Sequence, residues 1–176
     1  MNKFKDYKVD DQLKISDFKS KHLSAKYVSW LNDEEVVKYS EQRHKTHTIK
    51  SCKEYYLSQK KTDNLFLAIE TGPGFNIHIG NVGVNIDVVN NVADVSIIIG
   101  DKDYWGKGIG LKVWNSIIRK LIDDMNIRLV TAGTMENNIP MINLMKKSNM
   151  KIEAILRKRF IHNAEEIGMV VASITK

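Results

Sequence analysis

Along the first half of the chain, segments with the hydrophobic pattern of β-strands are interspersed with segments that have the pattern of α-helices. Residues 13–18 alternate like a first strand, and three later runs rich in apolar and β-branched residues predict further strands at 64–70, 77–88 and 92–99. Between the first two runs, apolar side chains recur at helical spacing, and the sequence predicts helical pieces after Ser24 and after Asp33 and a helix over residues 49–60.

The second half continues this alternation with one longer amphipathic helix. Apolar side chains recur every three or four residues between Val113 and Met125, which predicts a helix with one buried face. A strand at 127–134, a helix at 138–150 and strands at 150–161 and 168–174 are predicted to follow. The whole pattern predicts an α/β (α+β) fold with a mixed, largely antiparallel sheet flanked by helices, in a single domain over residues 1–176.

Three glycines, at 106, 108 and 110, separate the strand at 92–99 from the long helix. Glycine lets the backbone approach an anion closely, and the free amides and dipole of the following helix favour negative charge there. The phosphate loop of nucleotide hydrolases does not fit, because no Gly-Lys-Ser/Thr follows at the required spacing. The dinucleotide-binding fingerprint is disfavoured because Leu111 stands at the position of its third glycine. The context still predicts a phosphate-binding turn.

The run that begins at Trp105 resembles motif A of the GNAT superfamily of N-acetyltransferases, Arg/Gln-x-x-Gly-x-Gly/Ala, with Trp105 at the Arg/Gln position. Its Trp-Gly-Lys-Gly sequence is similar to the branch that contains the ribosomal-protein alanine acetyltransferases. Further on, Asn138 and Lys147 match the family's Asn-x-x-Ser-x-x-x-x-x-Lys-x-Gly-Phe helix, and Asn149 replaces its glycine. Asparagine tolerates the left-handed conformation that ends a helix. The resemblance covers most of the chain from about residue 13 to the end.

This resemblance implies that acetyl-coenzyme A is the cosubstrate, bound between the strands at 95–99 and 130–134, which splay apart in this family. Main-chain groups on the first of these strands would contact the pantetheine arm, and the glycine turn would hold the pyrophosphate. Asn138 has an alternative role as a helix cap, because Pro140 follows just inside the helix. The implied cofactor-binding residues are Ile97, Ile98, Ile99, Trp105, Gly106, Lys107, Gly108, Ile109, Gly110, Leu111, Asn138 and Lys147.

Acetyl transfer to an amine requires a base for the amine, donors for the developing oxyanion and an acid for the leaving thiolate. Asp94, one strand length before the glycine turn, is the best candidate for the base, either directly or through water; a carboxylate with no catalytic role is the alternative. Many family members carry a tyrosine acid seven residues after the motif asparagine, and this position is Met145 here. That absence favours a second hypothesis, a coenzyme A-binding module without catalysis.

A polar loop at residues 40–48 concentrates titratable side chains, and loops at this place shape the acceptor pocket in the family. Glu41, Arg43 and His44 are therefore our candidates for acceptor binding, with a solvated loop as the alternative. His44 and His47 lack a third ligand in register, so we expect no metal site. The other histidines, His22, His78 and His162, are isolated and are interpreted as surface or turn residues.

The chain carries 27 Lys and Arg against 21 Asp and Glu, a formal net charge of +6. These residues are spread along the sequence without interleaved aromatic residues, so nucleic-acid binding is not predicted. A basic surface suits an anionic cofactor and a diphosphate acceptor. The loop at Tyr39-Ser40-Glu41 also resembles that of surface-polysaccharide acetyltransferases. This resemblance and the charge together lead us to expect a small-molecule amine as substrate, the amino sugar of a sugar nucleotide, with a protein N-terminus as the runner-up and a polyamine as the least compatible acceptor.

The sequence carries less information about cellular location and oligomeric state. No apolar run approaches the ~20 residues that span a bilayer, and the charged opening at residues 1–5 lacks a secretory apolar core, so no membrane association and a cytoplasmic location are expected. The lone cysteine, Cys52, excludes an internal disulfide and is interpreted as an inert thiol. The apolar last strand could pair with a second copy in a homodimer, or it could be covered within one chain.

Overall fold

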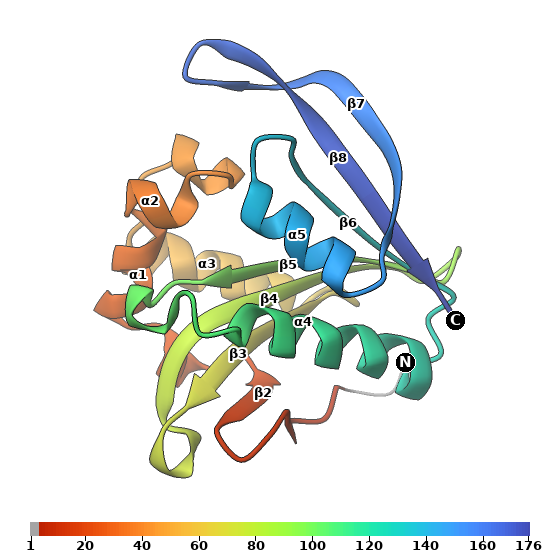
Figure 1. Ribbon diagram of the computed structural model, residues 1–176. Coiled ribbons are helices and arrows are strands. Elements are labelled where there is room, and N and C mark those ends of the chain that lie inside the picture. The colour runs from red at the N-terminus through yellow and green to blue at the C-terminus, as the bar shows by residue number, and fades with distance from the viewer. Residues whose placement is uncertain (1–3) are drawn as a thin grey trace.

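A computed structural model describes residues 4–176 and shows one eight-stranded sheet with helices on both faces (Figure 1). The strand order is β1-β2-β3-β4-β5-β6-β8-β7, and every neighbouring pair is antiparallel except β5 and β6. The predicted mixed, largely antiparallel sheet is thus confirmed. The first three residues of the predicted domain, which open the charged N-terminal stretch, lie outside the described residues.

The strands follow the apolar runs of the sequence. β5 has the predicted bounds, and Asn91 just before it adopts the left-handed conformation of the predicted turn, with φ 53°. A short strand, β1, was not predicted; it adds an edge next to β2. The strands are β1 (Tyr7–Lys8), β2 (Leu13–Asp17), β3 (Leu65–Thr71), β4 (Ile77–Asp87), β5 (Val92–Ile99), β6 (Leu129–Met135), β7 (Lys151–His162) and β8 (Glu165–Thr175).

The helices begin at the caps that the sequence indicates. The Ser24 side chain accepts from the Tyr27 amide, and the Asp33 carboxylate accepts from the first amides of the next helix. Asn149, at φ 61°, leaves the last helix in the left-handed conformation that was predicted for it. The α-helices are α1 (Ala25–Leu31), α2 (Glu34–Val37), α3 (Ile49–Gln59), α4 (Ile109–Arg119) and α5 (Ile139–Lys147), and a π-turn at Lys120–Asp124 extends α4.

Two groups of apolar side chains hold the helices to opposite faces of the sheet. The larger group joins α4 and α5 to the sheet around Trp114, whose indole is fully buried. The predicted apolar face of α4 is buried along its length, although Met125 is only partly covered. The smaller group joins α1 and α3 to β3 through Phe18, Tyr27 and Tyr56. The helices thus cover both faces of the sheet, and the parallel strands β5 and β6 lie between the two layers.

His22 and Glu70 form a buried polar cluster, which corrects the expectation that His22 lies on the surface. His22 is 2% exposed, and its Nδ1 accepts from the Lys19 amide, so its proton lies on Nε2, 3.0 Å from Glu70 Oε1. Ser16 and Lys21 also donate to this carboxylate. These donors overcome the effect of burial and lower the pKa of Glu70 to about 2.

His78 is half-buried, and its ring packs between His22 and Trp30. Its Nε2 donates to the Gly80 carbonyl at 2.9 Å. Burial lowers the pKa of His78 to about 4, and the nearby His22 adds to that shift. The ring is therefore neutral in the folded protein at pH 7. His162 does lie at the predicted turn, stacked on Tyr39.

The β7–β8 hairpin arches over α5 at the end of the sheet (Figure 1). β8 pairs with β6 on one side and with β7 on the other, so the last strand is covered within the chain and is not an edge that could pair with a copy. Among the residues described, no helix has the length and apolarity needed to cross a membrane.

Candidate functional site

The parallel strands β5 and β6 separate after three paired positions, the last of which is Asp94 with Thr131. Beyond this point the β6-facing edge of β5 has no strand partner. The Ile99 carbonyl faces this gap, where it accepts from Trp105 Nε1 at 2.7 Å, whereas the Ile98 carbonyl packs against Gly80 of β4. Polar groups of alternate residues point to the same edge of a strand, so Ile97 and Ile99 face the gap and Ile98 does not.

The glycine turn lies beside this gap and has the backbone conformation of an anion cradle. Gly106 and Gly108 have φ values of 72° and 73°, and a Cβ at either position would project into open space. Within the described residues, the amides from 106 to 111 donate to no protein acceptor, although Gly108 directly precedes α4. Free amides at the positive end of a helix dipole fit the pyrophosphate of coenzyme A.

The other side chains implied as cofactor contacts have different surroundings. Trp105 fastens the glycine turn to the end of β5 through its bond to the Ile99 carbonyl. Lys107 and Lys147 are exposed, and the Lys107 ammonium lies 5.4 Å from the ring centre of Tyr104. Both lysines are free to move toward a bound phosphate, because neither forms an ion pair with the described residues.

Asn138 joins α5 to the far side of the gap. Its Oδ1 caps α5 by accepting from the Met141 amide at 3.3 Å, and its Nδ2 donates to Thr134 Oγ1 at 2.8 Å. The capping role considered from the sequence is therefore present. The residue also borders the cavity described next, so its amide is placed where a ligand could exchange with these partners.

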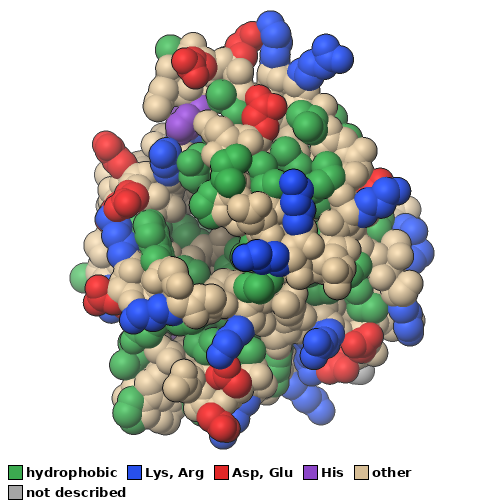
Figure 2. Space-filling model, in the orientation of Figure 1, with side chains coloured by type: hydrophobic (Ala, Val, Ile, Leu, Met, Phe, Trp, Pro, Cys, Tyr) green, Lys and Arg blue, Asp and Glu red, His purple; other side chains and the backbone are tan. Residues whose placement is uncertain are grey.

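A cavity of about 510 Å³ runs from the gap to the N-terminal helices. In the view of Figure 2 the surface is hollowed between these helices and α5, while basic and acidic side chains are interspersed over the surrounding face. No carboxylate lines the cavity among the described residues, and Lys45 is its charged side chain. Four aromatic side chains contribute to the walls: Tyr27, Tyr39, Tyr55 and Phe66.

The 40–48 loop forms part of the wall, but the three residues predicted for acceptor binding do not line the cavity. Arg43 instead ties the loop together and to β7, donating to the Ser40 and Ile161 carbonyls and to Glu41 Oε1. His44 is exposed beside Glu41. The residues of this loop that do line the cavity are Ser40, Gln42, Lys45, Thr46 and His47.

Asp94, the predicted base, lies just outside the cavity. Its carboxylate is on the same sheet face as Ser96, which lines the cavity two residues later, and it accepts from Thr131 Oγ1 at 2.8 Å. Desolvation raises the pKa of the Asp94 carboxyl, and the hydrogen bond from Thr131 partly opposes this shift. The group is thus shifted in the direction that a base requires.

Two residues considered from the sequence are buried in the protein. Met145, at the position of the family's tyrosine acid, is fully buried in the core. Cys52 is 2% exposed in the cavity wall, and burial raises the pKa of its thiol, which disfavours the reactive thiolate. Across residues 4–176, no group of three His, Cys, Asp or Glu side chains has a metal-binding arrangement.

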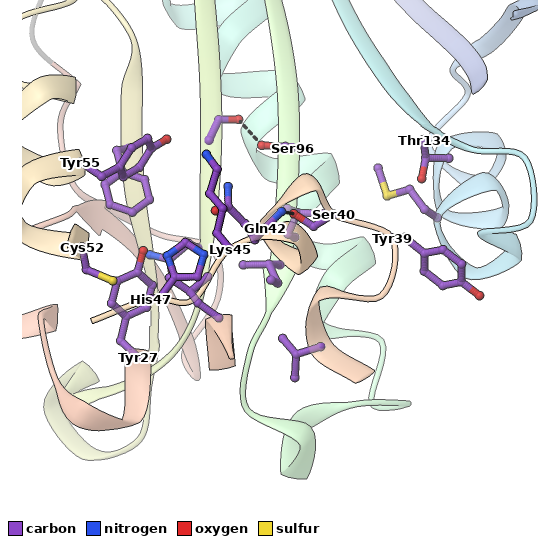
Figure 3. A pocket seen from close by; sticks show the side chains of 18 of the residues that line it. Tyr27, Tyr39, Ser40, Gln42, Lys45, His47, Cys52, Tyr55, Ser96 and Thr134 are labelled. Atoms are coloured by element: carbon purple, nitrogen blue, oxygen red, sulfur yellow. Dashed lines mark hydrogen bonds between the residues drawn. The ribbon is translucent and has the colours of Figure 1, made fainter. Parts of the chain in front are cut away.

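Asn81 and His47 line the cavity, but sequence reasoning did not select either as a site residue. Asn81 lies in β4, opposite Ile98 of β5. Its signal in the sequence is a polar residue between Gly80 and Gly83 of the strand. His47 belongs to the titratable groups of the 40–48 loop that suit an acceptor, but the predicted acceptor-binding residues were its neighbours Glu41, Arg43 and His44. Figure 3 shows His47 with Tyr27 and Cys52 toward the α3 end of the cavity, opposite Thr134 and Tyr39.

Comparisons with known proteins agree with this geometry. The spermidine N-acetyltransferase from Vibrio cholerae, in complex with CoA and spermine, superposes with a TM-score of 0.83 at 17% identity over 94% of this chain and 96% of that one. RimL, a ribosomal-protein alpha-N-acetyltransferase in complex with coenzyme A, gives 0.84 at 12% identity over 97% and 98%. The microcin self-immunity acetyltransferase MccE, with acetyl-CoA and AMP, gives 0.81 at 18% over 96% and 94%.

These structures share the fold of the chain, and the sequence itself identifies the family. The family model for the acetyltransferase (GNAT) domain matches residues 12–151, which include the glycine turn, the separated strands and most of α5 and the cavity wall. The match spans well over half of the 176 residues. The chain therefore belongs to the GNAT family of acetyltransferases.

Proposed function

We propose that this GNAT acetyltransferase transfers the acetyl group of acetyl-coenzyme A directly to a primary amine of an amino sugar on a nucleotide carrier. The observation that supports this most is the cavity, which joins the gap between β5 and β6 to a polar, aromatic chamber to which no described residue contributes a carboxylate. One end offers unpaired main-chain groups to a thioester arm. The rest of the cavity offers an acceptor polar and aromatic side chains and the ammonium group of Lys45.

Acetyl-coenzyme A supplies an activated acyl carbon as a thioester. In our proposal the amides from 106 to 111 hold its pyrophosphate, and Ile97 and Ile99 offer main-chain groups to its arm. Unpaired amides on the gap-facing edge of β5 are the donors for the developing oxyanion. Asp94 takes the amine proton through water, because its carboxylate lies beyond the cavity wall. As the new C–N bond forms, the C–S bond of the thioester breaks, and the released thiolate takes its proton from water.

The lining of the cavity argues against a polyamine acceptor. A second ammonium group would need a carboxylate partner once it left water, and the described lining contains none. Lys45 instead suits an anionic group, and the similar fold of MccE is seen with AMP. These observations favour a nucleotide-linked amine.

Two alternatives have support of their own. The fold of RimL and the Trp-Gly-Lys-Gly run favour a protein N-terminus as the acceptor. The burial of Met145, which leaves no tyrosine acid at this position, favours a coenzyme A-binding module without catalysis. The three hypotheses differ in what they predict for turnover.

A panel of acceptors separates them. With acetyl-coenzyme A present, we expect thiol release with UDP- and dTDP-linked amino sugars to exceed that with N-terminal peptides or spermidine by about tenfold or more in kcat/KM, because a site built for one acceptor leaves polar groups unpaired with others. Turnover with peptides alone would establish the protein N-terminus. Tight acetyl-coenzyme A binding with no turnover of any amine would establish the binding module.

Replacing Asp94 with asparagine tests the base. Asp94→Asn keeps the shape of the side chain and its contact with Thr131 but removes the proton acceptor. We therefore expect kcat to fall about a hundredfold, at the low end for general bases because water relays the proton. The dissociation constant for acetyl-coenzyme A should stay within twofold. Thr131→Val removes the hydrogen bond alone and is the matched control. An unchanged kcat in Asp94→Asn would remove Asp94 from the mechanism.

A further inference from the structure

Asn81 is buried in the cavity wall, and one of its polar atoms has no hydrogen-bond partner among the described residues. The residue is 4% exposed, and its Nδ2 donates to the Leu67 carbonyl at 3.1 Å, which fixes the orientation of the amide. Its Oδ1 is buried and has no partner among the described residues. Buried polar atoms are rarely left unpaired, so this oxygen requires a donor from outside the protein.

The neighbouring His78 does not supply that donor. Its buried Nδ1 lies within hydrogen-bond reach of the Asn81 side chain, and the two groups would pair if Nδ1 carried a proton. The Gly80 carbonyl holds the proton of the neutral ring on Nε2, so Nδ1 carries no proton to donate. Asn81 Oδ1 therefore remains an unsatisfied acceptor in the neutral protein.

A second unpartnered atom lies in the same cavity, Nε2 of His47. The backbone of His47 is fixed by the Asn32 side chain, which accepts from its N–H at 2.8 Å and donates to its carbonyl at 2.9 Å. These two hydrogen bonds to Asn32, the C-terminal cap of α1, hold the imidazole of His47 in the cavity wall. The atom can donate or accept, depending on the tautomer.

Aromatic rings complete this end of the cavity. Tyr27 is 4% exposed, and Tyr55 packs edge-on against Phe66 with ring centres 5.2 Å apart. In Figure 3, Tyr27, Tyr55 and His47 belong to the same end of the cavity, away from Thr134. Aromatic faces beside isolated hydrogen-bonding atoms suit an uncharged ring whose faces are apolar and whose edge carries polar groups.

We propose that Asn81 and His47 form a specificity subsite that holds hydroxyl groups on the sugar ring of the acceptor. A hydroxyl can donate to Asn81 Oδ1 and can pair with either tautomer of His47 Nε2, whereas an apolar side chain of a peptide N-terminus would leave both atoms unpaired. This inference rests on the proposed acetyl transfer and narrows it, because it names the part of the acceptor that is selected and the two residues that select it.

The test combines two variants with acceptors that lack single hydroxyls. Asn81→Ala and His47→Ala should each raise KM for a hydroxylated amino-sugar nucleotide about tenfold while kcat and acetyl-coenzyme A affinity stay within twofold. With the mono-deoxy acceptor that lacks the bonded hydroxyl, the variant and the native protein should have the same KM. Asn76→Ala, in the exposed turn before β4, is the control and should behave as the native protein.

His47→Ala keeps the test decisive if Asn81→Ala folds poorly, because His47 Nε2 makes no bond that its removal would break within the described structure. KM values that stay within twofold in both variants would overturn the proposal. If the variants changed only in thermal stability, the two atoms would bind structural water and the proposal would also be overturned.

Binding of the parent sugar nucleotide, which carries a hydroxyl in place of the amine, separates this inference from the proposed function. Calorimetry should show binding to the native protein that weakens about tenfold in both variants. If the parent compound binds in this way but no amino sugar is acetylated, the proposed function fails and the subsite stands. If peptides are acetylated and no sugar nucleotide binds, acetyl transfer stands and the subsite is overturned.

Discussion

Replacing Gly108 with valine should raise the dissociation constant of acetyl-coenzyme A by about a hundredfold or more, because the substitution harms the cradle in two ways. Gly108 has φ 73°, a left-handed conformation that a β-branched residue adopts only with strain. The open space beside it is also where a phosphate would meet the free amides, and valine would fill it. Isothermal titration calorimetry measures the effect directly.

Two further variants separate strain from obstruction. Gly74 has φ 66° and equally open surroundings in the turn before β4, so Gly74→Val should lower the free energy of unfolding by about 1–2 kcal/mol without changing acetyl-coenzyme A affinity. Gly108→Asn relieves the strain, since asparagine tolerates the left-handed region, but it still fills the cradle and should bind weakly. Affinity within threefold of native in both Gly108 variants would show that the cofactor phosphates bind elsewhere.

The elements that could be predicted from the sequence are those encoded by local spacing. The bounds of β5, the buried face of α4 and the left-handed Asn149 follow from β-branched runs, helical periodicity and the tolerance of asparagine for positive φ. The glycine turn belongs to the same class, because its function depends on neighbouring residues of one segment. Strand β1 could not be predicted, because two residues are too few to show the alternation of a strand.

The cavity could not be predicted in the same way, because its residues come from segments far apart in the chain. The loop at 40–48 was chosen correctly as a wall, but the side chains that face inward depend on how Arg43 ties it to β7, a contact across 118 positions. The buried His22 was misjudged for the same reason, since it meets Glu70 across 48 positions. The available local signal was the position of Asn81 between two glycines of β4.

The cluster around Glu70 and His78 should make the protein unstable in mild acid. His78 has its pKa lowered from 6.5 to about 4, so the unfolded chain binds a proton below pH 6.5 that the folded ring does not take up until about pH 4. Stability is therefore lost as the pH falls through this range. Glu70, lowered from 4.5 to about 2, extends the loss below pH 4.5 because the unfolded carboxyl protonates first. One pKa unit corresponds to about 1.4 kcal/mol.

Urea unfolding should thus show that the free energy of unfolding is about 2 kcal/mol lower at pH 4.5 than at pH 7, and this difference should depend on His78. His78→Gln keeps a donor for the Gly80 carbonyl but does not titrate, and it should lose this part of the pH dependence whatever its stability at pH 7. His44→Gln removes an exposed histidine and should retain the full fall. Equal slopes for the native protein and His78→Gln would mean that the pKa of His78 is the same in the folded and unfolded protein, so that burial of the ring does not contribute to the loss of stability in acid.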